Sequence, residues 1–412
     1  MTHAGTGFSS RTDSFRAGAE AAAAALDQAQ VRTCALAIIM STSRHNPQQF
    51  LAGVRAVLGP KPQVLGTYAV GIITNDDLGY DGYQCGVAVL ASDSIRADLF
   101  VQTDLADNEF ACGQALARQV LARSYDGPPS LLFFYDSINR TTGRFRMNMG
   151  TPLLAGMADA FGVGAGGRWP PAAGAGTMGD MQFRESFQWF DDKVLSCTAS
   201  ALVLSGGGVQ MHQRIMHGCL PASAYHTVTK ADGPVILEID HRPAALVLAD
   251  IIGANSGLGF EDYGWFITLG VNKGDKWGQF HEESYANRMC VGVDRKRQAL
   301  VMVEPDLVEG SEIQLMRRAF DFDYIYAETR SLLAEIEAIG HRPILAFYID
   351  CAGRAGAYSG NDQEEAREVQ KALGSIPLLG FYTGVEIAQL ATGNVVPLDW
   401  TGVLCIWSEP QA

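Results

Sequence analysis

Near-continuous apolar runs alternate along the chain with stretches in which apolar residues recur every three to four positions. The runs include SLLFFY at 130–135 and PILAFYI at 343–349. Such runs suit strands that are covered on both faces, and helical spacing follows them at 108–123 and 323–339. The pattern predicts an α/β protein whose mixed sheets are flanked by helices.

The spacing of these elements, with a looser stretch in mid-chain, predicts two related α/β domains. A Gly- and Pro-rich stretch at 162–180 has a composition that disfavours regular structure. The predicted organisation is an N-terminal helical segment at 1–30, a first domain at 31–208, a linker at 209–232 and a second domain at 233–412.

Two strand ends resemble one another closely. LLFFYDSINR ends at Arg140 and ILAFYIDCAGR ends at Arg354, so that Asp136 aligns with Asp350. The first strand gives a weaker third copy, with Ser41 followed by Arg44 but no aspartate at the end of the strand. These similarities predict that the domains are built from duplicated units.

The strand that follows each copy also repeats. VLGTYAVGI at 64–72 matches LLGFYTGVE at 378–386, which places Gly66 over Gly380 and Tyr68 over Tyr382. The duplication therefore extends over a strand, a helix and a second strand.

The repeated strand ends carry chemistry that suits a ligand site. In α/β proteins, ligands bind in crevices beyond the carboxyl ends of the strands. Arginine pairs with carboxylates and aspartate accepts from ammonium groups, so Arg140, Arg354 and their aspartates suit a zwitterion or a carboxylate. The alternative is that both arginines only brace their own turns, and repetition fits either interpretation.

The net charge of the chain disfavours some classes of binding partner. The net charge is −14 and 18% of the residues are charged. A surface this negative repels phosphate backbones and anionic lipids, so neither nucleic acid nor a membrane is expected as a partner. The first 20 residues contain no apolar signal-like core and no run spans a bilayer, so we expect a cytoplasmic protein.

The eight cysteines form no Cys-x-x-Cys pair, which favours reduced, buried thiols. Cys351 is the one candidate nucleophile, because it ends a strand close to Arg354. A Cys-dependent hydrolase is therefore one alternative function, although no histidine lies nearby in sequence to act as a base.

The histidines offer no clear metal site. His212 and His217 are the candidate haem ligands, but their spacing of five residues does not place them on one helical face. We expect no cofactor, with haem as the alternative, and no zinc.

Two regions of the chain resemble the FIST N and FIST C domains of the FIST family, named for F-box and intracellular signal-transduction proteins. The resemblance rests on AFYIDCAGRAGAYSG, PLLGFYTGVEIAQL and EPDLVEGSEIQLMRR in the second half, and on VLGTYAVGI in the first. Val385 separates Gly384 from Glu386, where the family usually joins them. We expect Glu386 to pair with Arg354, because a carboxylate on an apolar strand needs a cation or a ligand.

The resemblance implies a sensor that binds a small molecule, such as an amino acid or another organic carboxylate, and signals to a separate partner, for example a histidine kinase. Some family members are similar to haem-binding nitric-oxide sensors, which is the second alternative. The predicted ligand-binding residues are Tyr68, Asp136, Ser137, Arg140, Asp350, Cys351, Arg354, Tyr382 and Glu386.

Overall fold

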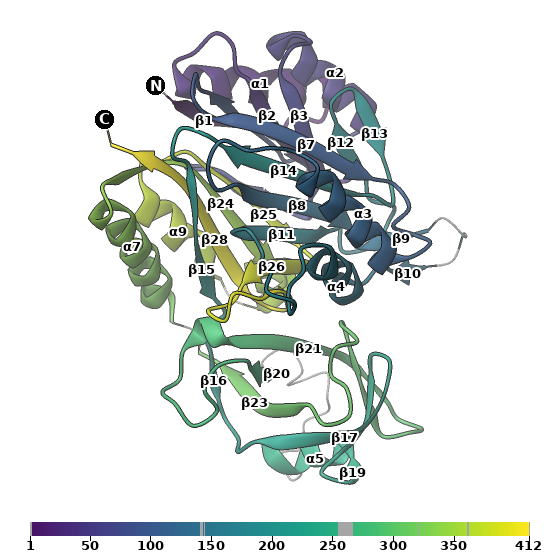
Figure 1. The fold of residues 1–412 in the computed structure, drawn as a ribbon. Coiled ribbons are helices and arrows are strands. Elements are labelled where there is room, and N and C mark those ends of the chain that lie inside the picture. The colour runs from purple at the N-terminus through teal and green to yellow at the C-terminus, as the bar shows by residue number, and fades with distance from the viewer. Residues whose placement is uncertain are drawn as a thin grey trace.

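A computed structural model describes residues 2–140, 143, 145–253, 267–319, 321–360 and 362–411. The chain forms a body of three helix-flanked sheets and a smaller, strand-rich domain beneath it in the view of Figure 1. No described helix combines the length and apolar character that crossing a membrane requires.

Each of the three sheets of the body has six strands. The first consists of β1 (His3–Ser9), β6 (Cys85–Ala91), β2 (Leu36–Ser41), β3 (Gln63–Tyr68), β12 (Gln188–Phe190) and β13 (Lys193–Leu195), in spatial order. The second consists of β7 (Arg96–Gln102), β14 (Ala199–Ser205), β8 (Ser130–Asp136), β11 (Ala172–Thr177), β26 (Val385–Gln389) and β27 (Val395–Leu398). The third consists of β15 (Gln210–Met216), β28 (Gly402–Pro410), β24 (His341–Cys351), β25 (Leu378–Thr383), β4 (Gly71–Ile73) and β5 (Leu78–Tyr80).

The three sheets share one topology. In each, the third and fourth strands form a parallel pair, β2 with β3, β8 with β11 and β24 with β25, and the other neighbours are antiparallel. The prediction of mixed sheets built from duplicated units is thereby confirmed, and the weak third copy in the sequence corresponds to a complete third unit.

The units are linked by an exchange of hairpins. The hairpin β4–β5 follows β3 in the chain but pairs with β25 of the third sheet. Likewise β26–β27 follows β25 and pairs with β11, and β12–β13 follows β11 and pairs with β3. Each unit thus completes the sheet of another unit, and the three exchanges form a closed cycle.

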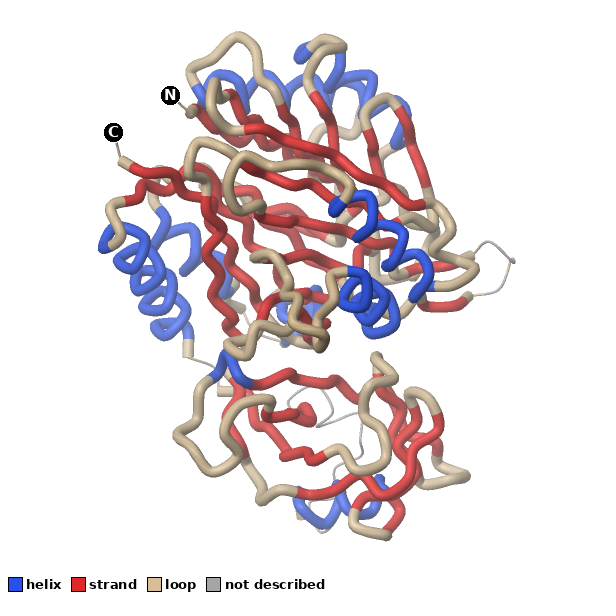
Figure 2. The backbone as a smooth tube through the Cα atoms, in the orientation of Figure 1, coloured by secondary structure: helices blue, strands red, loops and turns tan. Residues whose placement is uncertain are grey.

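Helices cover the outer face of every sheet, as Figures 1 and 2 show. The pairs are α1 (Ser14–Ala29) with α2 (Pro47–Leu58), α3 (Glu109–Leu121) with α4 (Gly150–Ala160), and α7 (Phe322–Ala338) with α9 (Glu365–Leu373). The inner faces of the three sheets pack on one another, for example through Met40, Phe134 and Phe381 in one shared apolar cluster. Burial on both faces explains why the central strands read as continuous apolar runs.

The smaller domain is inserted between β15 and α7. It contains β16 (Cys219–Pro221), β17 (His226–Asp232), β18 (Val235–Ile239), β19 (Arg242–Pro243), α5 (Ala244–Ile252), β20 (Ile267–Asn272), a short helix η3 (Glu282–Ser284), β21 (Tyr285–Asp294), β22 (Ala299–Met302) and β23 (Glu312–Arg318). We call residues 217–319 the inserted domain.

Several segments differ from the expected boundaries. Residues 209–232, assigned above to a linker, contain β15, β16 and β17, and the N-terminal segment begins with β1 before its helix. The stretch 162–180 contains the buried strand β11, whose sequence AAGAGT lacks the usual signature of a strand. Small residues are needed there, because a Cβ on Gly174 would lie 2.2 Å from the carbonyl oxygen of Phe133.

The pairing register also corrects the alignment of the repeat. In the parallel pairs, residues 131–136 lie opposite 172–177 and residues 346–351 lie opposite 378–383, so Gly174 is the counterpart of Gly380. Asp350 therefore corresponds to Tyr135, and Asp136 comes one position too late. Because side chains alternate along a strand, Asp136 and Asp350 face opposite sides of their sheets.

Candidate functional site

A hollow of about 260 Å³ lies beyond the carboxyl ends of the parallel strands. All three units contribute to it: Thr42–Arg44 follow β2, residues 179–182 follow β11, and Tyr358 belongs to the short helix α8 (Gly356–Ser359) after β24. Val70, Asp81 and Gly82 complete the lining. This is the edge at which α/β proteins bind ligands, as the sequence analysis expects.

The hollow carries both signs of charge. Arg44 is exposed and makes no hydrogen bond or ion pair with any described residue. The Asp180 carboxylate accepts a hydrogen bond from Ser43 Oγ at 2.6 Å, and Asp81 accepts one from Tyr358 Oη at 2.5 Å. An unpaired guanidinium therefore shares a small hollow with two carboxylates.

A glycine brings two of these loops together. The Ser43 amide donates to the Gly179 carbonyl at 3.0 Å. A Cβ on Gly179 would lie 2.8 Å from Ser43 Cβ and 3.0 Å from the Tyr68 ring. Only glycine permits this approach of the second unit's loop to the first unit's strand end.

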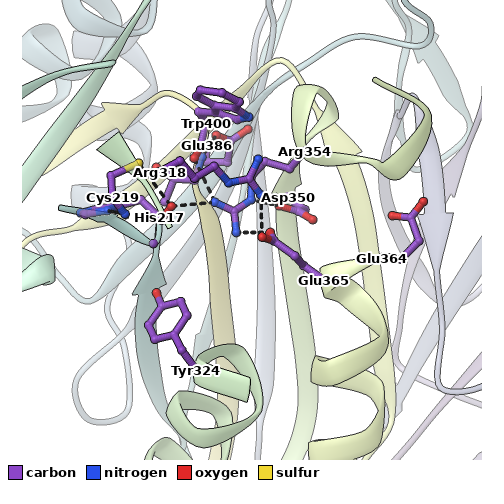
Figure 3. Close-up of polar contacts among 12 residues, drawn as sticks. His217, Cys219, Arg318, Tyr324, Asp350, Arg354, Glu364, Glu365, Glu386 and Trp400 are labelled. Atoms are coloured by element: carbon purple, nitrogen blue, oxygen red, sulfur yellow. Dashed lines mark hydrogen bonds and ion pairs between the residues drawn. The ribbon is translucent and has the colours of Figure 1, made fainter. Parts of the chain in front are cut away.

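Beside the third sheet lies a buried ion-pair cluster, drawn in Figure 3, which we call the arginine clamp: Asp350, Arg354, Glu365 and Arg318. Arg354 Nε lies 3.0 Å from Asp350 Oδ1, and Arg354 Nη2 donates to Glu365 Oε2. Arg318, from the inserted domain, donates to Glu365 Oε1 at 2.5 Å. All four side chains are buried.

Arg354 is held by protein groups through both of its terminal guanidinium nitrogens. Its Nη1 donates to the carbonyl oxygens of His217 and Trp400, at 3.1 Å each. Burial alone lowers the pKa of Arg354, but the Glu365 and Asp350 carboxylates outweigh burial and hold that pKa well above its usual value. Arg354 therefore acts as a charged brace, which is the alternative that the sequence left open.

Glu386 does not pair with Arg354 as expected. Its Oε2 accepts from the Thr401 amide at 3.2 Å, and its Oε1 has no partner among the described residues. Burial, reinforced by the nearby Asp350 and Asp399 carboxylates, raises the pKa of Glu386 well above its usual value. Burial therefore favours the neutral form of this side chain, which lies beside the arginine clamp.

Cys351 is also buried. Burial, and then the Glu386 carboxylate, raise the pKa of its thiol well above the usual value. The thiol thus stays protonated, whereas a nucleophile needs a thiolate. This environment offers no support for the hydrolase alternative.

The second unit's residues lie apart from the arginine clamp. Asp136 is buried and accepts from the Thr198 amide at 3.0 Å, and Ser137 Oγ donates to the Thr177 carbonyl at 2.8 Å. Arg140 is exposed and donates through Nε to the Phe183 carbonyl at 2.9 Å. Arg140 and Arg354 share no described contact, so the two arginines brace separate loops.

The repeated tyrosines occupy equivalent places under the helices. Tyr68 Oη donates to the His45 carbonyl at 2.6 Å, and Tyr382 Oη donates to Glu364 at 2.8 Å. Both rings are buried. None of the nine predicted ligand-binding residues lines the hollow.

The two candidate haem ligands are engaged with the protein. His217 is buried, with Nδ1 accepting from the Cys219 amide at 2.9 Å and Nε2 facing the Glu282 carbonyl at 3.2 Å. His212 Nε2 lies 2.8 Å from Ser408 Oγ. Haem binding stays a prediction, which a Soret band in protein from haem-supplied cells would test.

The sequence pattern pointed to Arg44, although not as a site residue. No pattern in the sequence pointed to Asp81, Asp180, Tyr358 or Glu365. Asp81 and Asp180 lie in loops and belong to no recognisable motif. Arg44 stood out only because it follows Ser41 at the spacing of the third copy of the repeat.

The chain resembles several proteins along nearly its whole length. An uncharacterized protein of Mycobacterium tuberculosis is 27% identical, over 95% of this chain and 96% of that protein. An uncharacterized protein of Mycobacterium bovis is 24% identical, over 95% of each chain. The crystal structure of a cyanuric acid hydrolase from A. caulinodans matches with a TM-score of 0.26 and 11% identity, over 50% of this chain and 71% of that one, which is too loose to inform fold or activity.

The family comparison covers most of the sequence. The FIST N domain matches residues 35–242 and the FIST C domain matches residues 244–389, so their junction falls within the inserted domain. The chain therefore belongs to the FIST family, as its motifs and its duplicated units predict.

Proposed function

We propose that this protein is a sensor whose hollow at the strand ends binds a small zwitterion, such as an amino acid or a related carboxylate. FIST domains are generally described as small-ligand-binding domains of signal transduction. The observation that carries the proposal is the unpaired Arg44 guanidinium in a hollow that also holds Asp81 and Asp180.

The chemistry of the hollow matches both ends of an amino acid. A guanidinium binds a carboxylate through two parallel hydrogen bonds, and aspartate oxygens accept from an ammonium group. The hollow, at about 260 Å³, lies just below the range of about 300–1,000 Å³ that is typical of drug-sized ligands. A ligand of amino-acid size fits that volume better than a nucleotide or a peptide.

The signal would pass to a separate protein, for example a histidine kinase. This part of the proposal rests on the family alone. The lining includes both polar groups and Met181 beside these charges.

A thermal-shift screen of amino acids and small carboxylates tests the proposal, with wild type, Arg44→Gln and Arg96→Gln compared. Arg96, at the start of β7, is a matched control, since its side chain is exposed and makes no described hydrogen bond or ion pair. We expect a ligand that raises the melting temperature of wild type and Arg96→Gln but not of Arg44→Gln. The proposal fails if no compound shifts wild type, or if Arg44→Gln responds equally.

A further inference from the structure

We infer that the inserted domain is the output element of this sensor, and that the arginine clamp couples its attachment to the occupancy of the hollow. This inference rests on the proposed function, because the signal that reaches the clamp is the binding of a small molecule in the hollow. It is carried by a continuous series of described contacts that begins at the wall of the hollow and ends at the two chain crossings into the inserted domain.

The first contacts join the wall of the hollow to Tyr80. Tyr358 lines the hollow and donates to Asp81, as described above, and its ring centroid lies 5.8 Å from that of Tyr80. The amide of the preceding residue, Ala357, donates to Tyr80 Oη at 3.0 Å. Helix α8 is therefore held in two ways, by the Tyr358 side chain bonded to Asp81 and by the Ala357 amide bonded to Tyr80.

Glu364 carries the contact onward. Its Oε1 accepts from Tyr80 Oη at 2.8 Å and from the Gly356 amide at 3.0 Å. Its Oε2 accepts from Tyr382 Oη at 2.8 Å. One carboxylate, on the residue that precedes α9, thus joins the first residue of α8 to Tyr80 and Tyr382 of the third sheet.

Glu365 follows Glu364 directly in the chain and holds both arginines of the clamp. A movement of α8 that displaces Glu364 acts on Glu365 through a single peptide unit, which is planar and stiff. Buried ion pairs depend strongly on geometry, since a poorly placed partner leaves a charge without compensation in a medium of low dielectric. The clamp is thus sensitive to small shifts of this segment.

The clamp holds both connections of the inserted domain. The incoming connection is held by Arg354 through the His217 carbonyl, and the outgoing one by Glu365 through Arg318. The connections also bind each other, because the Ala319 amide donates to the Gly218 carbonyl at 2.8 Å. Figure 3 shows His217, Cys219 and Arg318 gathered beside Arg354. Arg318 also lies over the Trp400 ring at 5.1 Å.

The direction of the coupling follows from a competition at Asp81. A ligand ammonium at Asp81 takes the carboxylate that accepts the Tyr358 hydroxyl, which weakens one of the contacts that hold α8. Occupancy of the hollow therefore loosens the arginine clamp and frees the two connections. Tyr358→Phe removes the same hydrogen bond and should mimic the ligand.

Hydrogen–deuterium exchange of the full chain tests this coupling in wild type, Tyr358→Phe and Tyr326→Phe. Tyr326, on α7 of the same unit, is half-buried, lies 5.0 Å below the Lys371 ammonium and makes no described hydrogen bond, so it is the matched control. The peptides that contain Cys219 and Ala319 report on the connections. We expect Tyr358→Phe to speed their exchange about five-fold or more, the lower end of typical coupling between sites, and Tyr326→Phe to leave it unchanged.

Saturating glycine, the smallest zwitterion, is then added to wild type and Arg44→Gln. Faster exchange at the connections in wild type alone supports both the coupling and the proposed function. A different result is that glycine raises the melting temperature of wild type while neither glycine nor Tyr358→Phe changes exchange at the connections. That result overturns the coupling and leaves the proposed function standing. If glycine has no effect but Tyr358→Phe still speeds exchange, the coupling holds and glycine is excluded as the ligand.

Discussion

Arg318 of the inserted domain and Arg354 of the three-sheet body each bind one oxygen of the same carboxylate, that of Glu365. All three groups are buried. Removing the Glu365 carboxylate leaves two buried guanidinium groups whose charge is only partly compensated. If one arginine is removed instead, the carboxylate still binds the other arginine. Glu365 is therefore the single group on which the attachment of the inserted domain most depends.

We expect Glu365→Ala to destabilise the protein by about 3–5 kcal/mol, the usual cost of breaking a buried ion pair. Glu368→Ala is the control on the same helix, because Glu368 pairs with the exposed Lys371 and such pairs contribute about 0–1 kcal/mol. Urea unfolding measures both. Similar losses for the two variants would show that the clamp contributes no more than a surface pair.

Thiol labelling should find Cys351 unreactive in the folded protein. Burial raises the pKa of Cys34, which is only half-buried, to about 11, and burial together with Glu386 raises the pKa of the fully buried Cys351 well above its usual value. With iodoacetamide at neutral pH, mass spectrometry should detect modification at Cys34 before Cys351. Rapid alkylation of native Cys351 would instead revive the hydrolase alternative.

Gly174→Ala should be strongly destabilising, because the new Cβ would lie 2.2 Å from the backbone carbonyl of Phe133 in the neighbouring strand. Overpacking of this kind costs about 1–3 kcal/mol, occasionally more. Gly292→Ala is the matched control in a strand, since its Cβ would meet nothing within 4 Å. Equal unfolding midpoints for the two variants would contradict the described packing of β11.

Stability should depend on pH through Asp136. Burial raises the pKa of Asp136 from 3.8 to about 7, so between about pH 4 and 7 the folded protein keeps a proton that the unfolded chain releases. The folded state therefore loses stability as pH rises through this window. Asp136→Asn removes the titrating group, and its stability relative to wild type should increase between pH 5 and pH 8, by up to about 3 kcal/mol.

The control for this measurement is Asp76→Asn, at an exposed position. It should change stability equally at both pH values. A constant difference between Asp136→Asn and wild type across the window would mean that Asp136 is ionised throughout.

The sequence was sufficient to predict the α/β class, the duplicated units and the family. Burial on both faces leaves continuous apolar runs. The match of Gly66 to Gly380 is visible in the sequence, and in the structure both glycines pair with the parallel strand of their own unit, opposite Ile39 and Tyr348. It was not sufficient to align the strand ends, since a shift of one residue reverses the face on which Asp136 lies.

The hairpin exchange could not be read from the sequence. A hairpin such as β4–β5 has the same local pattern whichever sheet it joins, and its pairing with β25 depends on contacts some 300 residues away along the chain. The hollow was missed for the same reason. Arg44, Asp81, Asp180 and Tyr358 come from three different units, and only the closed arrangement of those units brings them together.

The most direct test of the account is a crystal structure of the protein grown with the compound that gives the largest thermal shift. The account predicts ligand density in the hollow, with a carboxylate on the Arg44 guanidinium and an ammonium group on Asp81 or Asp180. Density for that compound at another place, with Arg44 still unpaired, would contradict the assignment of the hollow as the sensory site.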